Sequence, residues 1–531
     1  MELTEQLIDD FKHQGLFSEY LPSGFSISPV GGFDIFSIIP SEKSDNIEPY
    51  SFTMSNFSAN DKRRLLYLPE VTNYIKLINY MVDQGIINEI CDISSSDNHS
   101  FSHIIQTRDG ETSFIKHEGD YDIVTNHLVI NGAPQALQED RNDDPSTYTD
   151  NVVEKLNRAQ GAKGILLIDI ANCYKSIYTH YLACIKLGLH MANEQYKLSK
   201  ANMTLVDADY LRYVGLDEHV RLLNTNESSG ILTGPRVSNY IAEAFLSRIN
   251  IDIKQELESN PQIRYTDFVR YVDDYEFFIY DPKDVDAIIN TVENVFSKYR
   301  LTINEYKTKF LTFPYYVVKN LKRLYDSYAT GETITTEELI ELFNDYFNLE
   351  KDGVKGAIRY LIKSIQEDTV FEDKKLYTTF LFNILVNDNR SLVKVCQLII
   401  RDRDKLDIGN DHFLLIQRLL AQFIENKMDL ECIWLIYLLK KLGCLELGNE
   451  IIDKLINSDN ELAIIVLISE YGLSEEAMAT VVATADSWIL LYQLYFMDKL
   501  TPDEFKSRAS INHNLPFYRQ LKRKNFSFYR N

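Results

Sequence analysis

Carboxylates stand inside one apolar run of this sequence and at the end of another, and they have the residue types of a metal site. Asp273 and Asp274 stand side by side within Phe268–Ile279, an otherwise largely hydrophobic segment. An uncompensated carboxylate is costly to bury, so charged residues in such a run usually pair with other groups or bind a metal. Asp169 ends a second apolar run, Gly164–Ile168. Where such strands meet, the carboxylates could hold two divalent cations about 4 Å apart, as phosphoryl transfer requires.

The chemistry of these side chains indicates magnesium. Mg²⁺ prefers a few carboxylates together with phosphate oxygens and water. Neither motif contains a histidine, and no cysteine ligand is needed. We therefore expect two Mg²⁺ ions, for which Mn²⁺ could substitute, and a role for Asp169 and Asp273 in bridging them.

The elements that must position these residues lie between Gly164 and about Phe313. The pattern alternates strand, helix, hairpin, helix and strand, and the segment 284–299 places its apolar residues on one helical face. Asp284 is an expected N-cap, and Leu301–Asn304 is the next expected strand. This order predicts a compact α+β unit in which helices cover one face of an antiparallel sheet.

Two further segments of this unit could contact a substrate. Gly230–Asn239 contains Thr233, Gly234 and Pro235; glycine permits a close backbone approach and proline favours the start of a helix. Taken alone, the segment is more simply an ordinary junction between a loop and a helix. Lys307 follows the last strand and could meet a triphosphate or pyrophosphate, although an exposed lysine is the simpler interpretation.

The regions on either side have different characters. Residues 1–160 mix short apolar segments with polar loops, and Arg63 and Arg64 there are interpreted either as solvated residues at an element edge or as triphosphate contacts. Residues 317–531 carry helix signals, including capping boxes at Thr335–Glu338 and Thr501–Glu504. We expect an all-helical domain there, arranged as stacked helix pairs but without a strict repeat period.

Size and composition limit the possible classes of protein. A chain of 531 residues is too long for one core and predicts two or three domains. The start of the sequence shows no signal peptide and no apolar run is long enough to span a bilayer, so we expect a cytoplasmic protein without a membrane partner. The six cysteines show no C-x-x-C pair and are expected to be buried thiols. A net charge of −23 means that any nucleic acid must meet a local basic groove.

The ordered motifs resemble those of reverse transcriptases. Asp169-x-x-x-x-Tyr174, Thr233-Gly234-Pro235-x-x-Ser238, Tyr271-Val272-Asp273-Asp274 and Leu301-x-Ile303-x-x-x-Lys307 are similar to motifs A, B, C and D, in that order. The resemblance implies fingers in residues 1–160, a palm with a ferredoxin-like antiparallel sheet in residues 161–316, and a helical-repeat-like domain in residues 317–531.

The resemblance also implies roles for individual residues. Asp169 and Asp273 would bind the metal ions with help from the Ile170 carbonyl, and Asp274 would complete the catalytic acidic group. The remaining positions would contact the nucleotide, with Tyr174 as a steric gate that favours deoxynucleotides; they are Tyr174, Thr233, Gly234, Pro235, Lys307, Arg63 and Arg64. Thr233 departs from the glutamine that most retron and group II intron enzymes have there.

The layout is similar to that of abortive-infection polymerases of bacterial phage defence, the AbiK-like group. That resemblance implies a homo-oligomer that polymerises dNTPs without a template, primed by one of its own tyrosines, so that the single-stranded DNA product is covalently attached. The sequence does not identify this tyrosine; Tyr20, Tyr50, Tyr67 and Tyr121 are among many. RNA is left open as a further partner.

Two alternatives remain open. One is an RNA-templated reverse transcriptase of retron or group II intron type. The other is an inactive palm that serves as an oligomeric scaffold, although the intact Asp169, Asp273 and Asp274 argue against it. The C-terminal segment 517–529, which mixes aromatic and basic residues, is interpreted either as a strand-binding tail or as a solvated terminus or subunit contact.

Overall fold

The computed structural model describes residues 3–530 except 57–58, 109–110, 115–120, 123–126, 131–132, 137–146, 264–265, 316–320 and 330–332. Its centre is a four-stranded antiparallel sheet built from β8 (Gly164–Asp169), β9 (Thr266–Tyr271), β10 (Asp274–Ile279) and β11 (Lys309–Thr312). The strand order is β11-β8-β10-β9, so the two strands that end or begin with an aspartate, β8 and β10, are direct neighbours. With its intervening helices, this is the β-α-β-β-α-β order of a ferredoxin-like unit.

Side chains alternate between the two faces of this sheet. Leu166, Ile168 and Phe277 belong to the main core, on the side where α8 (Arg236–Ser259) and α9 (Val285–Lys298) pack. Ile165, Val269 and Phe278 form a smaller core with Ala159 and Ala162, which follow α4 (Thr147–Arg158). The prediction that helices cover one face therefore needs correction, because the chain around the end of α4 covers part of the second face. Both faces of β8 and β10 are apolar for this reason.

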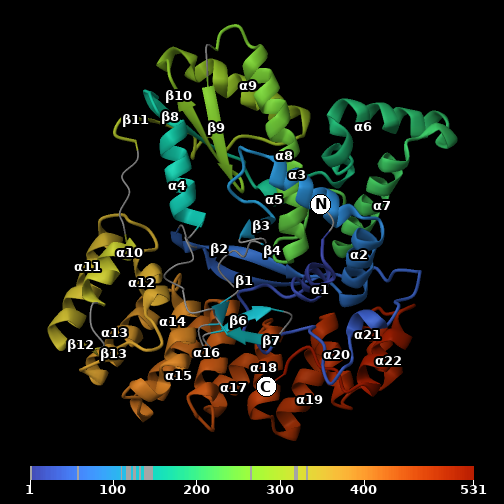
Figure 1. Ribbon diagram of the computed structural model, residues 1–531. Coiled ribbons are helices and arrows are strands. Elements are labelled where there is room, and N and C mark those ends of the chain that lie inside the picture. The colour runs from blue at the N-terminus through green and yellow to red at the C-terminus, as the bar shows by residue number, and fades with distance from the viewer. Residues whose placement is uncertain are drawn as a thin grey trace.

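A long hairpin precedes the four-stranded sheet in the chain. β1 (Tyr50–Asn56) and β2 (Ala59–Leu68) pair in an antiparallel register in which Arg63 lies opposite Ser55 and Arg64 opposite Met54. Figure 1 shows this hairpin between the four-stranded sheet and the C-terminal helices. The remaining elements are α1 (Glu5–His13), η1 (Ile35–Ser37), α2 (Val71–Asp83), α3 (Ile86–Ser96), β3 (Ile105–Arg108), β4 (Glu111–Phe114), β5 (Tyr121–Asp122), β6 (His127–Ile130), β7 (Ala133–Ala136), α5 (Cys173–Ser176), η2 (Thr179–Tyr181), α6 (Cys184–Ala201), η3 (Met203–Leu205), α7 (Ala208–Leu223) and η4 (Pro282–Asp284).

The C-terminal part is helical and forms two rows of helices (Figure 1). Helices α12, α14, α16, α18 and α20 contact one another in succession, and α15, α17 and α19 do so in the second row. A two-residue parallel strand pair, β12 with β13, departs from the all-helical prediction. The elements are α10 (Leu321–Tyr328), β12 (Thr333–Ile334), α11 (Thr336–Lys351), α12 (Ala357–Ser364), β13 (Val370–Phe371), α13 (Lys374–Asn387), α14 (Leu392–Arg401), η5 (Arg403–Lys405), α15 (Asn410–Glu425), α16 (Asp429–Lys441), α17 (Asn449–Ile456), α18 (Glu461–Tyr471), α19 (Glu475–Thr484), α20 (Trp488–Phe496), α21 (Pro502–Arg508) and α22 (Leu515–Arg523). Across the described ranges, no helix combines the length and the apolar character needed to cross a bilayer.

The end of the described chain packs against its beginning. Tyr529 forms a β-bridge with Phe25, and the amide of Arg530 donates to the carbonyl of Gly24 at 2.9 Å. Phe526 and Phe528 are buried, as is Tyr529. Both interpretations of the aromatic C-terminal segment were therefore wrong for these rings, which belong to the core that joins the helical rows to residues 20–30.

Candidate active site

Asp169, Asp273 and Asp274 converge at one edge of the four-stranded sheet. One carboxylate oxygen from each lies within 4.8 Å of the others. The backbone fixes this arrangement: Asp274 pairs with Asp169 in the strand register, and the amide of Ile170 donates to the Asp273 carbonyl at 3.2 Å. The sequence-based expectation that the two motifs meet is confirmed by this geometry.

The β9–β10 turn that presents Asp273 is strained. It has two residues, Val272 and Asp273, and Val272 has a φ of 53°. Two-residue hairpins usually place glycine, asparagine or aspartate at such a position, and a β-branched residue there is an outlier. Backbone strain of this kind costs about 1–3 kcal/mol and is found where surrounding contacts hold it in place.

Donor groups from the segment after α9 surround the Asp169 carboxylate. Asn304 Nδ2 donates to Asp169 Oδ1 at 2.8 Å, and Lys307 Nζ lies 2.5 Å from Oδ2. Burial alone would lower the pKa of Lys307, but its bond to Asp169 and the charges of the three carboxylates raise the pKa above its ordinary value. The site therefore favours positive charge, and the sequence prediction that Lys307 contacts a triphosphate stays a prediction.

The two adjacent carboxyl groups repel further negative charge. Burial, followed by the charge of Asp169, raises the pKa of Asp273. Burial, followed by the charge of Asp273, raises the pKa of Asp274 to about 6. Three oxygen donors with mutual repulsion fit a divalent cation such as Mg²⁺ or Mn²⁺, which Asp169 and Asp273 would hold. When bound, such ions orient the attacking oxygen and neutralise charge on the transferred phosphate.

The raised pKa of Asp274 has a measurable consequence for stability. Its folded value of about 6 exceeds the model value of 3.8, so the contribution of the protonated group to stability is present below about pH 4 and is lost as pH rises through 6. We expect Asp274→Asn to stabilise the metal-free protein at pH 8 by about 1 kcal/mol or less, because the side chain is exposed and solvent screens its charge. Denaturant unfolding at pH 8 and pH 4 measures this, and a destabilised variant at pH 8 would contradict it.

The predicted nucleotide contacts of motifs A and B lie close to one another. Tyr174 donates from its hydroxyl to Asn239 Oδ1 at 2.9 Å, which joins α5 to α8. Thr233 accepts at its carbonyl from the amide of Tyr67 at 2.8 Å, and Pro235 immediately precedes α8. Strand β2 is thus attached to the motif B loop, although contact of these residues with a nucleotide stays a prediction.

The two arginines of β2 have different surroundings. Arg63 Nη2 lies 2.8 Å from Glu431 Oε2 on α16, so it binds the hairpin to the helical region. Arg64 is exposed, and its positive charge acts on Asp273 and Tyr174. Because neighbouring residues of a strand point to opposite faces, only one of the two can face the carboxylates. We retain Arg64 as the stronger candidate for nucleotide binding; the assignment of Arg63 stays an untested prediction.

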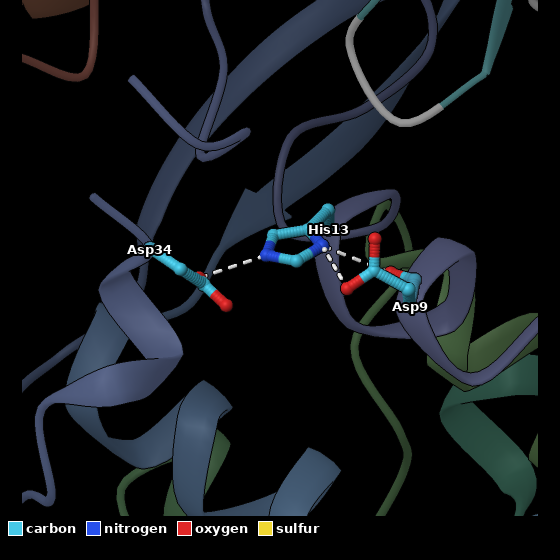
Figure 2. Close-up of side chains that lie close together, drawn as sticks. All are labelled: Asp9, His13 and Asp34. Carbon is cyan, nitrogen blue, oxygen red and sulfur yellow. Dashed lines mark hydrogen bonds and ion pairs between the residues drawn. The ribbon is translucent and has the colours of Figure 1, made fainter. Parts of the chain in front are cut away.

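A second group of residues with metal-binding side chains lies where the end of α1 meets Asp34, and Figure 2 shows its three members. His13 Nε2 lies 2.8 Å from Asp34 Oδ1, while Nδ1 lies 2.9 Å from the Asp9 carbonyl and 3.3 Å from Asp9 Oδ1. Both ring nitrogens therefore face acceptors at hydrogen-bonding distance, which is the geometry of a doubly protonated imidazolium rather than of a metal ligand.

This second group predicts a pH-dependent contribution to stability. Burial would lower the pKa of His13, but the hydrogen bond and charge of Asp34, together with Asp9, raise it above 6.5. The contribution is fully present below pH 6.5 and is lost as pH rises through the raised pKa. We expect His13→Gln to destabilise the protein by about 1.5–3 kcal/mol at pH 6 and by less at pH 9. Denaturant unfolding at both values tests this; an equal loss at both would contradict it.

Sequence reasoning missed the residues that support the candidate metal site. Arg270 is fully buried and forms a bidentate pair with Glu243 of α8, at 2.8 Å for each bond. The signal was available, because a charged residue inside an apolar strand needs an opposite charge and Glu243 lies on an apolar helix. Asn239 and Asn304 gave no comparable signal, since polar residues near a turn are ordinary.

One comparison with known proteins, the match to a family model, agrees with this chemistry. Residues 122–361 match the family model described as "Reverse transcriptase (RNA-dependent DNA polymerase)". No curated protein matches the sequence significantly. Among solved structures, telomerase from Candida albicans with a fragment of telomeric RNA is 12% identical, with a TM-score of 0.29 over 82% of this chain and 64% of that chain.

Apo telomerase from Candida tropicalis is also 12% identical, with a TM-score of 0.31 over 79% of this chain and 69% of that one. Both TM-scores are too low to support an argument about fold or function. The present chain spans less than two thirds of the first of these telomerases. The family match includes all three carboxylates, and the chain therefore contains a reverse-transcriptase-like polymerase domain.

Proposed function

We propose that the chain is a DNA polymerase that adds dNTPs by divalent-metal-dependent phosphoryl transfer. The observation that carries this proposal is the convergence of Asp169, Asp273 and Asp274 inside the region that matches the reverse transcriptase family. Asp169 and Asp273, with the Ile170 carbonyl, would hold the cations, and Asp274 would complete the acidic group. The nucleotide would lie against Tyr174, the Thr233–Pro235 loop, Arg64 and Lys307.

The proposal extends to untemplated synthesis primed by a tyrosine of the protein, within a homo-oligomer that acts in phage defence. Its support is the order of the four motifs and the helical region that follows them. The acidic charge of −23 also suits a protein that does not grip a long template duplex. Untemplated synthesis, tyrosine priming and the oligomeric state are testable on the purified chain, and phage defence is testable in cells that express it.

A priming tyrosine must be exposed and must reach the carboxylates. Of the tyrosines whose side chains the structure describes, Tyr196, Tyr271 and Tyr306 expose more than a third of their surface. Tyr271 pairs with Asp274 in the sheet, and Tyr306, which is 95% exposed, precedes Lys307. These two are therefore our candidates for the first nucleophile.

Three of the four tyrosines singled out from the sequence are less suitable. Burial raises the pKa of Tyr50 well above its ordinary value, and its hydroxyl accepts from the amide of Glu461 at 2.9 Å. Tyr20 and Tyr67 are partly buried and pack against the main core. The side chain of Tyr121 lies outside the described residues.

RNA-templated synthesis is the second candidate, and the description of the matching family as RNA-dependent DNA polymerases favours it. The two candidates separate in one experiment. The purified chain is incubated with Mg²⁺ and dNTPs, with and without RNA, and its intact mass is measured. Repeating nucleotide increments on the protein without RNA are the expected result. Incorporation that requires RNA, with no adduct, would favour the second candidate instead.

The residue that carries the attached nucleotide identifies the primer, and Tyr→Phe variants test that assignment. Digestion of the labelled protein should place the adduct on the peptide that contains Tyr306 or on the one that contains Tyr271. Tyr306→Phe and Tyr271→Phe each remove one candidate hydroxyl. Tyr196→Phe is the control, because it removes an exposed hydroxyl that lies outside the motifs containing Tyr271 and Tyr306. An adduct that persists in the Tyr271→Phe/Tyr306→Phe double variant would exclude both candidates.

A further inference from the structure

The strained turn that presents Asp273 is held by hydrogen bonds to both polar groups of Val272. The amide of Val272 donates to Ser102 Oγ at 2.9 Å. Its carbonyl accepts from Arg270 Nη1, also at 2.9 Å. A residue with a φ of 53° and a β-branched side chain would relax toward an ordinary conformation unless such contacts opposed it.

The partners of Val272 in these two bonds, Ser102 as acceptor and Arg270 as donor, belong to one buried cluster. Arg270 and Glu243 form a bidentate pair, and Ser102 Oγ donates to Glu243 Oε2 at 2.8 Å. Ser100 Oγ donates to Glu243 Oε1 at 2.6 Å. Every member is nearly inaccessible to solvent, with exposed fractions of 0% for Arg270, 6% for Glu243, 1% for Ser100 and 4% for Ser102. Planar bidentate pairing fixes the guanidinium, and so fixes the direction of its remaining N–H groups.

The cluster joins three parts of the chain at the metal site. Ser100 and Ser102 follow α3, Glu243 lies on α8, and Arg270 lies on β9. The backbone continues the connection, because the Arg270 amide donates to the His99 carbonyl and the Phe101 amide donates to the Arg270 carbonyl, both at 2.7 Å. The segment 99–101 is thus hydrogen-bonded to β9 at Arg270, two residues before Val272 in the turn.

We propose that Ser102, Arg270 and Glu243 are positioning residues that hold the Val272–Asp273 turn in its strained conformation and so aim the Asp273 carboxylate at Asp169. The inference rests on the proposed role of these aspartates as cation ligands. Without the Ser102 bond, the turn would relax and the Asp273 oxygen would leave the range in which one ion contacts both carboxylates. Partners of metal ligands commonly change metal affinity by about 10- to 100-fold when they are removed.

Ser102→Ala and Ser100→Ala form a matched pair. Both remove a buried hydroxyl that donates to Glu243, but only Ser102 also contacts Val272. We expect Ser102→Ala to weaken Mn²⁺ binding, measured by electron paramagnetic resonance without nucleotide, by about 10-fold or more. Ser100→Ala loses the bond to Glu243 and the acceptor of the Ser102 amide at 3.1 Å, but it keeps the bond between Ser102 and Val272. It should therefore change Mn²⁺ affinity by less than about 3-fold. Equal effects of the two variants would overturn the proposal.

A second substitution separates the strain from the general loss of a buried bond. Glycine adopts positive φ without steric cost, so Val272→Gly removes the need for the Ser102 bond. The Ser102→Ala effect on Mn²⁺ affinity should therefore shrink to less than about 3-fold in the Val272→Gly background, a non-additive result expected for coupled residues. Additive effects would show that Ser102 does not act through the conformation of residue 272.

Hydrogen exchange on the wild-type protein tests the proposal without any variant. The Val272 amide should be protected although it lies at the tip of a hairpin, because it donates to a buried hydroxyl. Exchange at the rate of a free turn amide would contradict the clamp. A protein that binds Mn²⁺ through Asp273 but makes no DNA would refute the polymerase proposal and leave this inference standing.

Discussion

Asp273→Asn is expected to reduce nucleotide incorporation at least a thousandfold, which corresponds to about 4 kcal/mol of transition-state stabilisation. The substitution keeps the size of the side chain but removes the charge that would neutralise a divalent cation beside Asp169. The variant should remain folded, because burial and the charge of Asp169 raise the pKa of Asp273 and the uncharged amide avoids that repulsion. Single-turnover incorporation of labelled dNTPs measures the loss.

Asp267→Asn is the matched control, since it makes the same change on β9, the strand that leads into the turn containing Asp273. Asp267 accepts from the amide of Phe268 at 2.8 Å and lies 3.6 Å from Arg158, outside the acidic group. It should retain incorporation within a few-fold of wild type. An Asp273→Asn protein that keeps a tenth of the activity would contradict the proposed chemistry. Loss of activity with preserved phage defence would support the scaffold alternative instead.

Gly234→Ala is expected to produce the second-largest effect. Gly234 has a φ of 126°, and a Cβ there would lie 2.7 Å from the carbonyl oxygen and 3.1 Å from the amide nitrogen of Tyr67. Both are backbone atoms of β2, so the hairpin and the motif B loop must move apart. A displacement of about 1 Å in a site that orients substrates can cost about 100-fold in rate. Steady-state kinetics with varied dNTP concentration and an unfolding curve measure the change.

Gly353→Ala is the control for Gly234→Ala, because it places alanine at a positive φ without a steric clash. Gly353 has a φ of 93° and no neighbouring atom within 4 Å of an added Cβ. Gly353→Ala should therefore lower the free energy of unfolding by only roughly 1–2 kcal/mol, the cost of a left-handed conformation for an L-residue. Nucleotide incorporation should be unchanged. Equal losses of activity in the two variants would show that contact with β2 is not the reason for the glycine.

The sequence allowed the chemical centre to be predicted because its residues break a strong rule. Carboxylates seldom occur within apolar strands, so Asp169, Asp273 and Asp274 were conspicuous, and the apolar runs around them predicted neighbouring strands. The same rule marks Arg270 and Glu243 individually, but the sequence does not show that they pair with each other, because helix α8 approaches β9 only in the folded protein. Pairing between distant segments is set by tertiary packing.

Long-range contacts also explain what the sequence left undecided about the arginines and the C-terminal end. Arg63 and Arg64 are equivalent by type, and only the register of β1 with β2 and the position of Glu431 on α16 separate them. Phe526 and Phe528 resemble a strand-binding tail by composition, yet they are buried in the core. Aromatic residues beside basic ones suit both roles, so composition could not distinguish them.

The helical region reaches the candidate site through the β1–β2 hairpin. Asp429 and Glu431, in the first turn of α16, accept from the amides of Thr53 and Ser55 at 2.8 and 2.9 Å. At its other end, β2 binds the motif B loop through Tyr67 and Thr233. The edge of the hairpin is therefore covered, and the helical rows contribute to the position of the loop next to the carboxylates.

The most direct measurement of the central claim is anomalous diffraction from crystals grown with Mn²⁺ and a non-hydrolysable dNTP. The account predicts Mn²⁺ peaks in contact with carboxylate oxygens of both Asp169 and Asp273, with the triphosphate beside them, and no peaks there in crystals of Asp273→Asn. Peaks that avoid these two residues in the wild-type protein, with nucleotide bound elsewhere, would contradict it.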